Sequence, residues 1–213
     1  MEFTGLETLT INQEFNHLAS TAQVTKTMRA LEANGIHTVV FEAGEEARAY
    51  VLSLIPAGAV VYNPPSRTLE QIGLTVEIET AVRFQPLRSR LRTLDRVKDQ
   101  AEYRKLVAGP DVVVGSVHAI TEKGEALVSS ATGSQLASEA SGAGRVIWVA
   151  GTQKLVSTLD EGLRRIREYS YPLEDERTRQ AYGQPSAIHK ILVVNGEYSG
   201  RITLVLVKQN LGF

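Results

Sequence analysis

The stretch RVIWVAG, residues 145–151, constrains the fold more than any other part of the sequence. Its interior residues are all apolar, so apolar and polar positions do not alternate along it. This pattern is typical of strands in parallel sheets that are covered on both faces. An amphipathic segment follows, and its start carries a T-x-x-E capping box, Thr158 to Glu161. A buried strand followed by a helix predicts a three-layer α/β sandwich with a mostly parallel central sheet.

The same alternation of short apolar runs and helical patterns continues along the chain. By hydrophobic spacing we expect strands at 36–41, 59–62, 111–115 and 125–130, and helices at 13–34, 44–55, 66–72, 86–107 and 158–166. We expect a short helix of small residues at 131–144. We expect a polar helix or a turn at 172–183. The closely joined strand, helix and strand of residues 36–62 predict a parallel βαβ unit with a right-handed crossover.

Near the C-terminus, two apolar runs flank a glycine-containing turn at 195–200. This pattern predicts a β-hairpin, without indicating whether the hairpin joins the main sheet. Neither an internal repeat nor a low-complexity linker divides the chain. We therefore expect a single α/β domain over residues 1–213.

Composition excludes several classes of function. The net charge is −1, with no basic stripe, so binding of nucleic acid is not expected. The chain has no cysteine, which excludes disulfides, thiolate nucleophiles, iron–sulfur clusters and cysteine zinc sites within it. None of its four histidines has metal-ligand spacing to another, so we expect no metal site and no cofactor. The N-terminal residues do not resemble a signal peptide and the apolar runs are too short to span a bilayer, so a cytoplasmic protein without membrane contact is expected.

Four polar, glycine-containing segments follow predicted strands or precede predicted helices: 66–73, 121–124, 129–133 and 151–154. Ligands of open α/β sheets bind outside the carboxyl ends of the parallel strands. Backbone N–H groups at helix N-termini suit an anion such as a carboxylate or phosphate. Simple chain reversal also explains each segment taken alone. No phosphate-binding P-loop, dinucleotide fingerprint or nucleophile elbow is present. Together the segments predict a small-anion site.

Lys154 is the central candidate, because an ammonium just past a buried strand can pair with an anionic ligand; a surface lysine is the alternative. Glu122 is the candidate for catalytic proton transfer, or an exposed turn acid. His118 follows the third strand and is either an acid–base group or, as we favour, a structural histidine. The remaining candidate ligand-binding residues are Ser66, Thr68, Gly73, Thr121, Gly124, Ser130, Thr132, Gly133, Gly151 and Gln153.

A set of ordered segments resembles the LUD domain, the lactate-utilisation protein family. These segments are FNHLAS, PPSRTLEQIGL, SVHAITEKGEALVSSATGSQLA, VIWVAGTQKLVSTLDEGLRRI and PLEDERTRQAYG. The resemblance implies an α/β fold of the sugar-phosphate isomerase and CoA-transferase type. It also implies a link to lactate oxidation, in which some members act with iron–sulfur and oxidase partners. It puts Ser66, Thr68, Gly73, Thr121, Gly124, Thr132, Gly133, Gly151 and Lys154 at the ligand edge. The cysteine-rich segments of some members are absent here, so direct electron transfer by this chain is not expected.

The leading hypothesis is therefore a LUD-domain protein that binds a small hydroxy or keto acid, or a sugar phosphate, and assists lactate metabolism. Lys154 would hold the anion, and Ser66, Thr68 and Thr132 would bond its oxygens. One alternative is a non-catalytic sensor or assembly subunit acting through the C-terminal hairpin or the arginine-rich helix at 86–107. Another is a sugar-phosphate isomerase that uses Glu122. Whether the chain is an enzyme, and whether it forms a homo-oligomer, stays open at this point.

Overall fold

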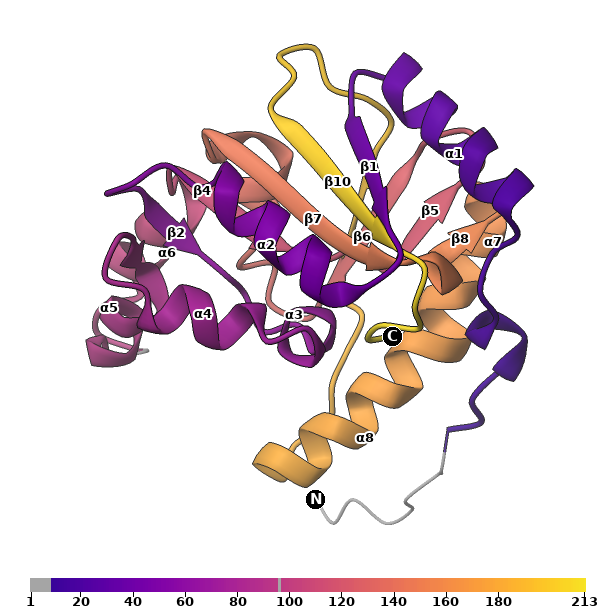
Figure 1. Cartoon of the computed structure of the whole chain (residues 1–213). Coiled ribbons are helices and arrows are strands. Elements are labelled where there is room, and N and C mark those ends of the chain that lie inside the picture. The colour runs from indigo at the N-terminus through magenta and orange to yellow at the C-terminus, as the bar shows by residue number, and fades with distance from the viewer. Residues whose placement is uncertain (1–8, 96) are drawn as a thin grey trace.

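A computed structural model describes residues 9–95 and 97–213. Its larger sheet has six strands, all parallel, in the order β1-β10-β7-β4-β2-β3 (Figure 1). Their bounds are His37–Phe41 (β1), Val60–Tyr62 (β2), Gln85–Pro86 (β3), Val112–Gly115 (β4), Arg145–Gly151 (β7) and Ile202–Val207 (β10). The predicted α/β class and parallel central sheet are confirmed.

Both faces of this sheet are covered, as the apolar pattern of β7 predicts. Val146 and Trp148 of β7 belong to one buried cluster, whereas Ile147 and Val149 belong to another, because successive side chains of a strand point to opposite faces. Helices α2 (Gly44–Leu54), α3 (Arg67–Gln71) and α4 (Leu74–Thr80) cover the second face. Helices α1 (Thr21–Ala33), α5 (Leu87–Thr93) and α6 (Gln100–Ala108) contribute to the first.

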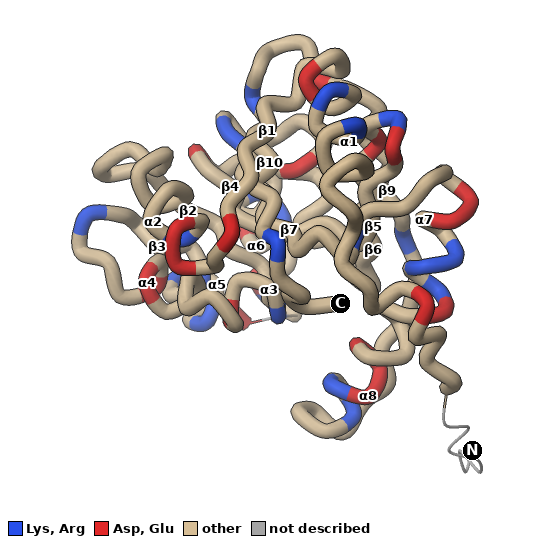
Figure 2. Tube along the Cα trace, turned by 45° about the vertical axis from the view of Figure 1, so that its right-hand side comes forward, with Lys and Arg blue, Asp and Glu red and all other residues tan. Residues whose placement is uncertain are grey.

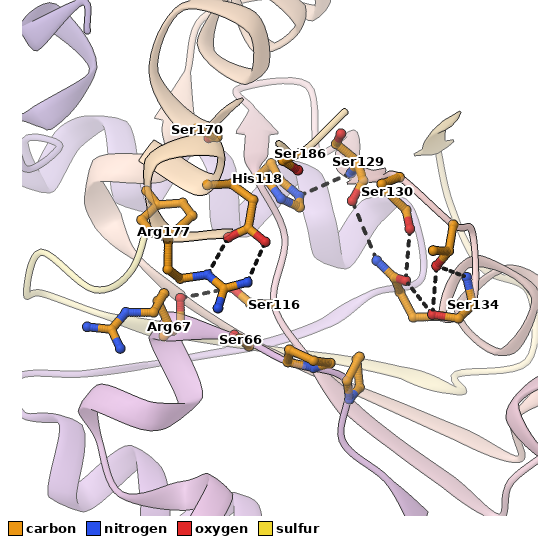
Figure 3. A pocket seen from close by; sticks show the side chains of 18 of the residues that line it. Ser66, Arg67, Ser116, His118, Ser129, Ser130, Ser134, Ser170, Arg177 and Ser186 are labelled. Atoms are coloured by element: carbon orange, nitrogen blue, oxygen red, sulfur yellow. Dashed lines mark hydrogen bonds and ion pairs between the residues drawn. The ribbon is translucent and has the colours of Figure 1, made fainter. Parts of the chain in front are cut away.

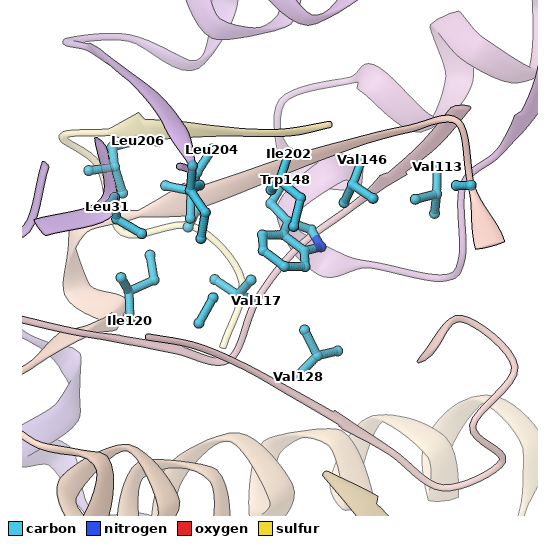
Figure 4. Close-up of a cluster of buried hydrophobic side chains, with 14 of the residues drawn as sticks. Leu31, Val113, Val117, Ile120, Val128, Val146, Trp148, Ile202, Leu204 and Leu206 are labelled. Atoms are coloured by element: carbon cyan, nitrogen blue, oxygen red, sulfur yellow. The ribbon is translucent and has the colours of Figure 1, made fainter. Parts of the chain in front are cut away.

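A second, smaller sheet packs against the Trp148 face of the first. Its strands are β5 (Ala119–Thr121), β6 (Ala126–Ser130), β8 (Leu155–Val156) and β9 (Lys190–Val194), in the order β8-β5-β6-β9. Figure 4 shows Ile120 and Val128 of this sheet opposite Trp148 and Leu204 of the larger one. The short 3-10 turn η3 (Thr152–Lys154) leads from β7 into β8, and so connects the two sheets.

The prediction of a C-terminal β-hairpin is wrong. β9 pairs antiparallel with β6 in the smaller sheet, whereas β10 lies between β1 and β7 in the larger one. All six residues of β10 are buried, which is the pattern of a central parallel strand rather than of a hairpin arm. The connection between β9 and β10 turns at glycines, and turn chemistry alone does not specify which strands pair.

Two predicted helices are each interrupted. The expected helix at 13–34 is a 3-10 turn, η1 (Gln13–Asn16), followed by α1, whose N-cap Ser20 accepts a hydrogen bond from the Gln23 backbone N–H. The expected helix at 86–107 is divided into α5 and α6. Between them, the Asp95 carboxylate accepts hydrogen bonds from the backbone N–H groups of Val97 and Lys98. Such local bonds compete with helix formation.

The helix predicted at 158–166 is longer than its pattern indicates. α7 (Leu159–Arg165) continues through a π-helical turn, η4 (Ile166–Ser170), into α8 (Tyr171–Tyr182), which ends at Gly183 with φ 67°. A second π-helical turn, η2 (Ser138–Gly142), precedes β7. Basic and acidic residues both occur along α7 and α8 (Figure 2). In the described ranges, every helix is too short or too polar to cross a membrane.

Candidate functional site

A cavity of about 700 Å³ lies at the carboxyl ends of β2 and β4. Its wall includes Tyr62 at the end of β2 and Ser116 and His118, which follow β4. Side chains from the first turn of α3, from the loop after β6 and from α8 complete it (Figure 3). The cavity therefore occupies the position at which open α/β sheets bind their ligands.

The side chain of Lys154 reaches this cavity from the 3-10 turn after β7. Lys154 is only 1% exposed, and its Nζ lies 3.0 Å from each of three oxygens: Thr68 Oγ1, Ser116 Oγ and the Val117 carbonyl oxygen. Burial lowers the pKa of Lys154 well below its ordinary value, and the nearby Arg165 cation lowers it further. The surface-lysine interpretation is wrong, since the amine points inward.

Arg165 of α7 is a second buried cation behind the same wall. It has no exposed surface, and its Nη1 donates to Ser170 Oγ at 3.1 Å and to the His118 carbonyl oxygen. Within residues 9–95 and 97–213 its Nε and Nη2 have no hydrogen-bond partner, and its guanidinium carbon lies 5.0 Å from the Tyr169 ring centroid. Burial lowers the pKa of Arg165 to about 10, so the group stays charged at neutral pH.

Neither cation has a carboxylate partner within the described ranges, where every ion pair involves other residues. Buried charges in folded proteins are normally paired. Arg165, together with Lys154 in its protonated form, thus gives this part of the molecule an uncompensated positive potential. An anion in the adjoining cavity would compensate for it.

His118 lines the cavity as a neutral ring. Its Nδ1 accepts a hydrogen bond of 3.1 Å from the Ser129 backbone N–H, which leaves the ring proton on Nε2 (Figure 3). Burial, together with the positive charges of Lys154 and Arg165, lowers the pKa of His118 to about 3. His118 thus makes a structural hydrogen bond, in agreement with the role that the sequence favours, and it lies in the cavity wall with its ring proton on Nε2.

A different part of the cavity wall is neutral. Glu139 of η2 is 1% exposed, and burial raises the pKa of its carboxyl to about 8, with a smaller opposing effect of the Trp148 indole. Gly115 makes room for it, because a Cβ at that position would lie 2.9 Å from Glu139 Oε1. Burial also raises the pKa of Tyr62, whose hydroxyl donates to Ser134 Oγ at 3.4 Å. Protonated carboxyl and phenol groups suit hydroxyl or carbonyl oxygens of a ligand.

Five of the sequence candidates line the cavity: Ser66, Thr68, Ser130, Thr132 and Lys154. Ser66 is also the N-cap of α3, accepting from the Leu69 backbone N–H at 3.4 Å. Thr68 is buried and contacts Lys154, whereas Thr132 is exposed on the loop after β6. The turns at 66–68, 130–132 and 154 thus converge, as the sequence predicts for a single ligand edge.

Four other candidates have structural positions outside the cavity lining. Gly151 packs against the backbone of Gln209 and Leu211, and the Gln153 side chain donates to the Leu211 carbonyl oxygen at 2.8 Å. Gly73 begins α4 with φ 73°, and Gly133 turns the loop after β6 with φ 82°. These two glycines take a left-handed conformation that other residues rarely adopt.

Thr121, Glu122 and Gly124 form the turn between β5 and β6, away from the cavity lining. Glu122 pairs with Lys26 of α1 at 2.6 Å, and Gly124 lies against the backbone of the same helix. β6 runs from this turn towards Ser130, so only its far end reaches the cavity. Glu122 therefore contacts α1 and not the cavity.

Sequence reasoning missed Ser116, Glu139 and Arg165. Ser116 directly follows a predicted strand in the segment GSVH, which is the same signal that selected the other candidates. Glu139 and Arg165 lie in segments that read as ordinary polar helix, so no local signal marks their burial. No group of three or more potential metal ligands occurs in the described part of the chain.

The sequence model of the LUD domain matches residues 24–209. The chain belongs to the LUD domain family. A crystal structure of a DUF162 family protein from Deinococcus radiodurans is similar to this LUD-domain chain, with a TM-score of 0.49 and 14% sequence identity. The match covers 90% of this chain and 99% of that one. No curated protein matches the sequence.

Proposed function

We propose that this LUD-domain chain binds a small anionic metabolite, a hydroxy or keto acid or a sugar phosphate, in the cavity beside Lys154. Membership in the family supports a protein related to lactate utilisation. The observation that carries the proposal is the Lys154 side chain, which is fully buried among three neutral oxygens and has no carboxylate partner among the residues that the structure describes. A bound anion would restore the charge of the amine, because an opposite charge nearby favours the ammonium form.

Other basic side chains of the cavity wall are already neutralised. Arg67 pairs with Glu70 at 2.7 Å, Arg177 pairs with Glu174 at 2.6 Å, and both Arg88 and Arg92 pair with Glu79. Lys154 therefore differs from them in having only uncharged partners. This difference makes Lys154 the group that would gain most from an anion.

The rest of the wall suits the uncharged part of such a ligand. His118 offers an Nε2 proton, Glu139 a protonated carboxyl and Tyr62 a phenol, all bordering the same cavity. A volume of about 700 Å³ lies within the range of ordinary metabolite sites. Since this chain has no cysteine, any iron–sulfur cluster used in lactate oxidation would belong to a partner protein.

Binding measurements on matched variants test the proposal. L-lactate, pyruvate and ribose 5-phosphate are titrated by calorimetry into the wild-type protein, with glycerol as the uncharged control. Lys154→Met removes the amine at similar volume, and Lys26→Met removes a lysine that pairs with Glu122 outside the cavity. We expect at least one anion to bind the wild type and the Lys26 variant. We expect Lys154→Met to weaken that binding by roughly 1.5–3 kcal/mol, the range for a charge-assisted bond. Equal binding to Lys154→Met, or no binding of any anion, would refute the proposal.

A further inference from the structure

The hydrogen bonds around Lys154 Nζ single out one cavity hydroxyl. A neutral amine has two protons to donate and one lone pair that accepts. The Val117 carbonyl oxygen can only accept, so it takes one amine proton at 3.0 Å. Thr68 donates its own proton to the Leu211 carbonyl oxygen at 3.2 Å, so its oxygen takes the second amine proton. The lone pair of a neutral amine is then left for Ser116 Oγ, 3.0 Å away, whose hydroxyl also lies within hydrogen-bond distance of Thr68 Oγ1 at 3.2 Å and of the Val117 carbonyl oxygen at 3.3 Å.

Of the two hydroxyls that contact this amine, only Ser116 is open to a ligand. Thr68 is 1% exposed, whereas Ser116 is half-buried and lines the cavity. The other serines of the described cavity wall make no hydrogen bond with Lys154: Ser66, Ser129, Ser130, Ser134, Ser170 and Ser186. A cavity serine whose hydroxyl oxygen lies 3.0 Å from the amine of a buried lysine is the arrangement of serine–lysine nucleophiles.

We propose that Ser116 is a nucleophile activated by Lys154, and that the chain hydrolyses small uncharged acyl esters in this cavity. The inference rests on the proposed anion site, because it uses the same cavity and the same amine, which can act as a base only while no anion is bound beside it. His118 lies two residues after Ser116 in the same wall, and its Nε2 proton is available for a developing oxyanion.

The reaction balances with water as the only co-reactant. The proton of Ser116 moves to Lys154 Nζ as the Ser116 oxygen bonds the ester carbonyl carbon. The carbon–oxygen bond to the alcohol then breaks, and the alcohol oxygen takes the proton from Lys154. In the second half, water gives a proton to Lys154 and its oxygen bonds the acyl carbon. The bond to Ser116 breaks, Ser116 recovers its proton from Lys154, and one carboxylic acid and one alcohol have formed.

Covalent labelling tests the nucleophile separately from anion binding. The probe is diisopropyl fluorophosphate, which is uncharged, and the adduct is located in the wild-type protein by peptide mass spectrometry. We expect an adduct on Ser116, and labelling about a hundredfold slower in Lys154→Met, the range for loss of a general base. Ser53→Ala, which alters an exposed serine of α2 outside the cavity, should label at the wild-type rate.

The labelling rate in the wild type should rise with pH and level off below the pH at which an ordinary lysine loses its proton. An absent adduct, an adduct on another serine, or equal rates in Lys154→Met would overturn the proposal. Mapping in the wild type decides the matter even where a variant fails to fold. Anion binding without an adduct refutes the nucleophile alone, whereas an adduct without anion binding refutes the anion site.

Discussion

The amine of Lys154 lies 3.0 Å from the hydroxyl of Ser116, although the two residues are 38 positions apart in the chain. Their strands explain this proximity. β4 and β7 are parallel neighbours, with Gly115 opposite Trp148, and each residue follows the carboxyl end of one of them. The sheet topology thus places a buried base and a reachable hydroxyl at one edge, beside a cavity.

Anion binding should take up protons. Burial lowers the pKa of Lys154, and a bound anion would raise it again, because an opposite charge nearby favours the ammonium form. Calorimetry at one pH in two buffers with different ionisation enthalpies measures this uptake. We expect net uptake of up to about one proton per ligand in the wild type, and tighter binding as the pH falls from 9 to 6. Binding with no proton uptake, or an identical uptake in Lys154→Met, would contradict this account.

Removing the buried amine should change how stability depends on pH. The pKa of Lys154 is lower in the folded protein than in the unfolded chain, so the unfolded chain binds more protons between the two values. The free energy of unfolding of the wild type therefore gains a contribution that increases as pH rises towards 10.5. Urea unfolding from pH 7 to 10 should show this increase, reduced in Lys154→Met. The same slope in both proteins would show that the amine is not perturbed.

Glu139 should give the opposite trend at lower pH. Its pKa is raised from 4.5 to about 8, so the folded protein binds more protons than the unfolded chain between these values. This contribution is fully present below pH 4.5 and is lost as the pH rises to 8. It amounts to at most about 5 kcal/mol, at roughly 1.4 kcal/mol per pKa unit. Glu139→Gln, which keeps the shape of a protonated carboxyl, should flatten the decline measured by urea unfolding. A decline that persists in this variant would assign it to another group.

Gly151 has a packing role that a substitution would expose. A Cβ there would overlap the Gln209 carbonyl oxygen and lie 2.8 Å from the Leu211 backbone nitrogen. We expect Gly151→Ala to lower the free energy of unfolding by roughly 2–3 kcal/mol, as overpacking does. Gly109→Ala is the matched control, because its Cβ would meet only the Gly142 carbonyl oxygen, at 3.6 Å. Equal stabilities of the two variants, measured by chemical denaturation, would argue against this packing role.

Glu122 gives a test of the sequence-based assignment. Glu122 lies on the turn between β5 and β6, and its carboxylate pairs with Lys26 of α1. The Lys26 side chain is 66% exposed. Glu122→Gln should leave ligand affinity unchanged and cost no more than about 1 kcal/mol of stability, as exposed ion pairs do. Calorimetry and urea unfolding on the same sample measure both. A large loss of affinity would restore Glu122 to the site.

The sequence predicts the class of fold well, because β7 is apolar on both faces and helical patterns follow the strands. It predicts Lys154 at the site for the same reason, since the carboxyl ends of parallel strands form one edge. It fails where pairing depends on distant partners. The segments of β9 and β10 look like two arms of one hairpin, yet each joins a different sheet. Glu122 lies on a polar turn, as the other candidate site residues do. The two strands that flank this turn belong to the smaller sheet, and the turn contacts α1 rather than the cavity. Arg165 reads as helix surface, and only the packing of α7 shows that it is buried.

The most direct test of the central claim is a crystal structure of the protein soaked with L-lactate, pyruvate or ribose 5-phosphate. We expect a carboxylate or phosphate oxygen in the cavity beside Lys154, at normal hydrogen-bond distance either from Lys154 Nζ or from its cavity-facing partner Ser116 Oγ. An anion bound elsewhere, or an unliganded cavity at a concentration that saturates binding in solution, would contradict it.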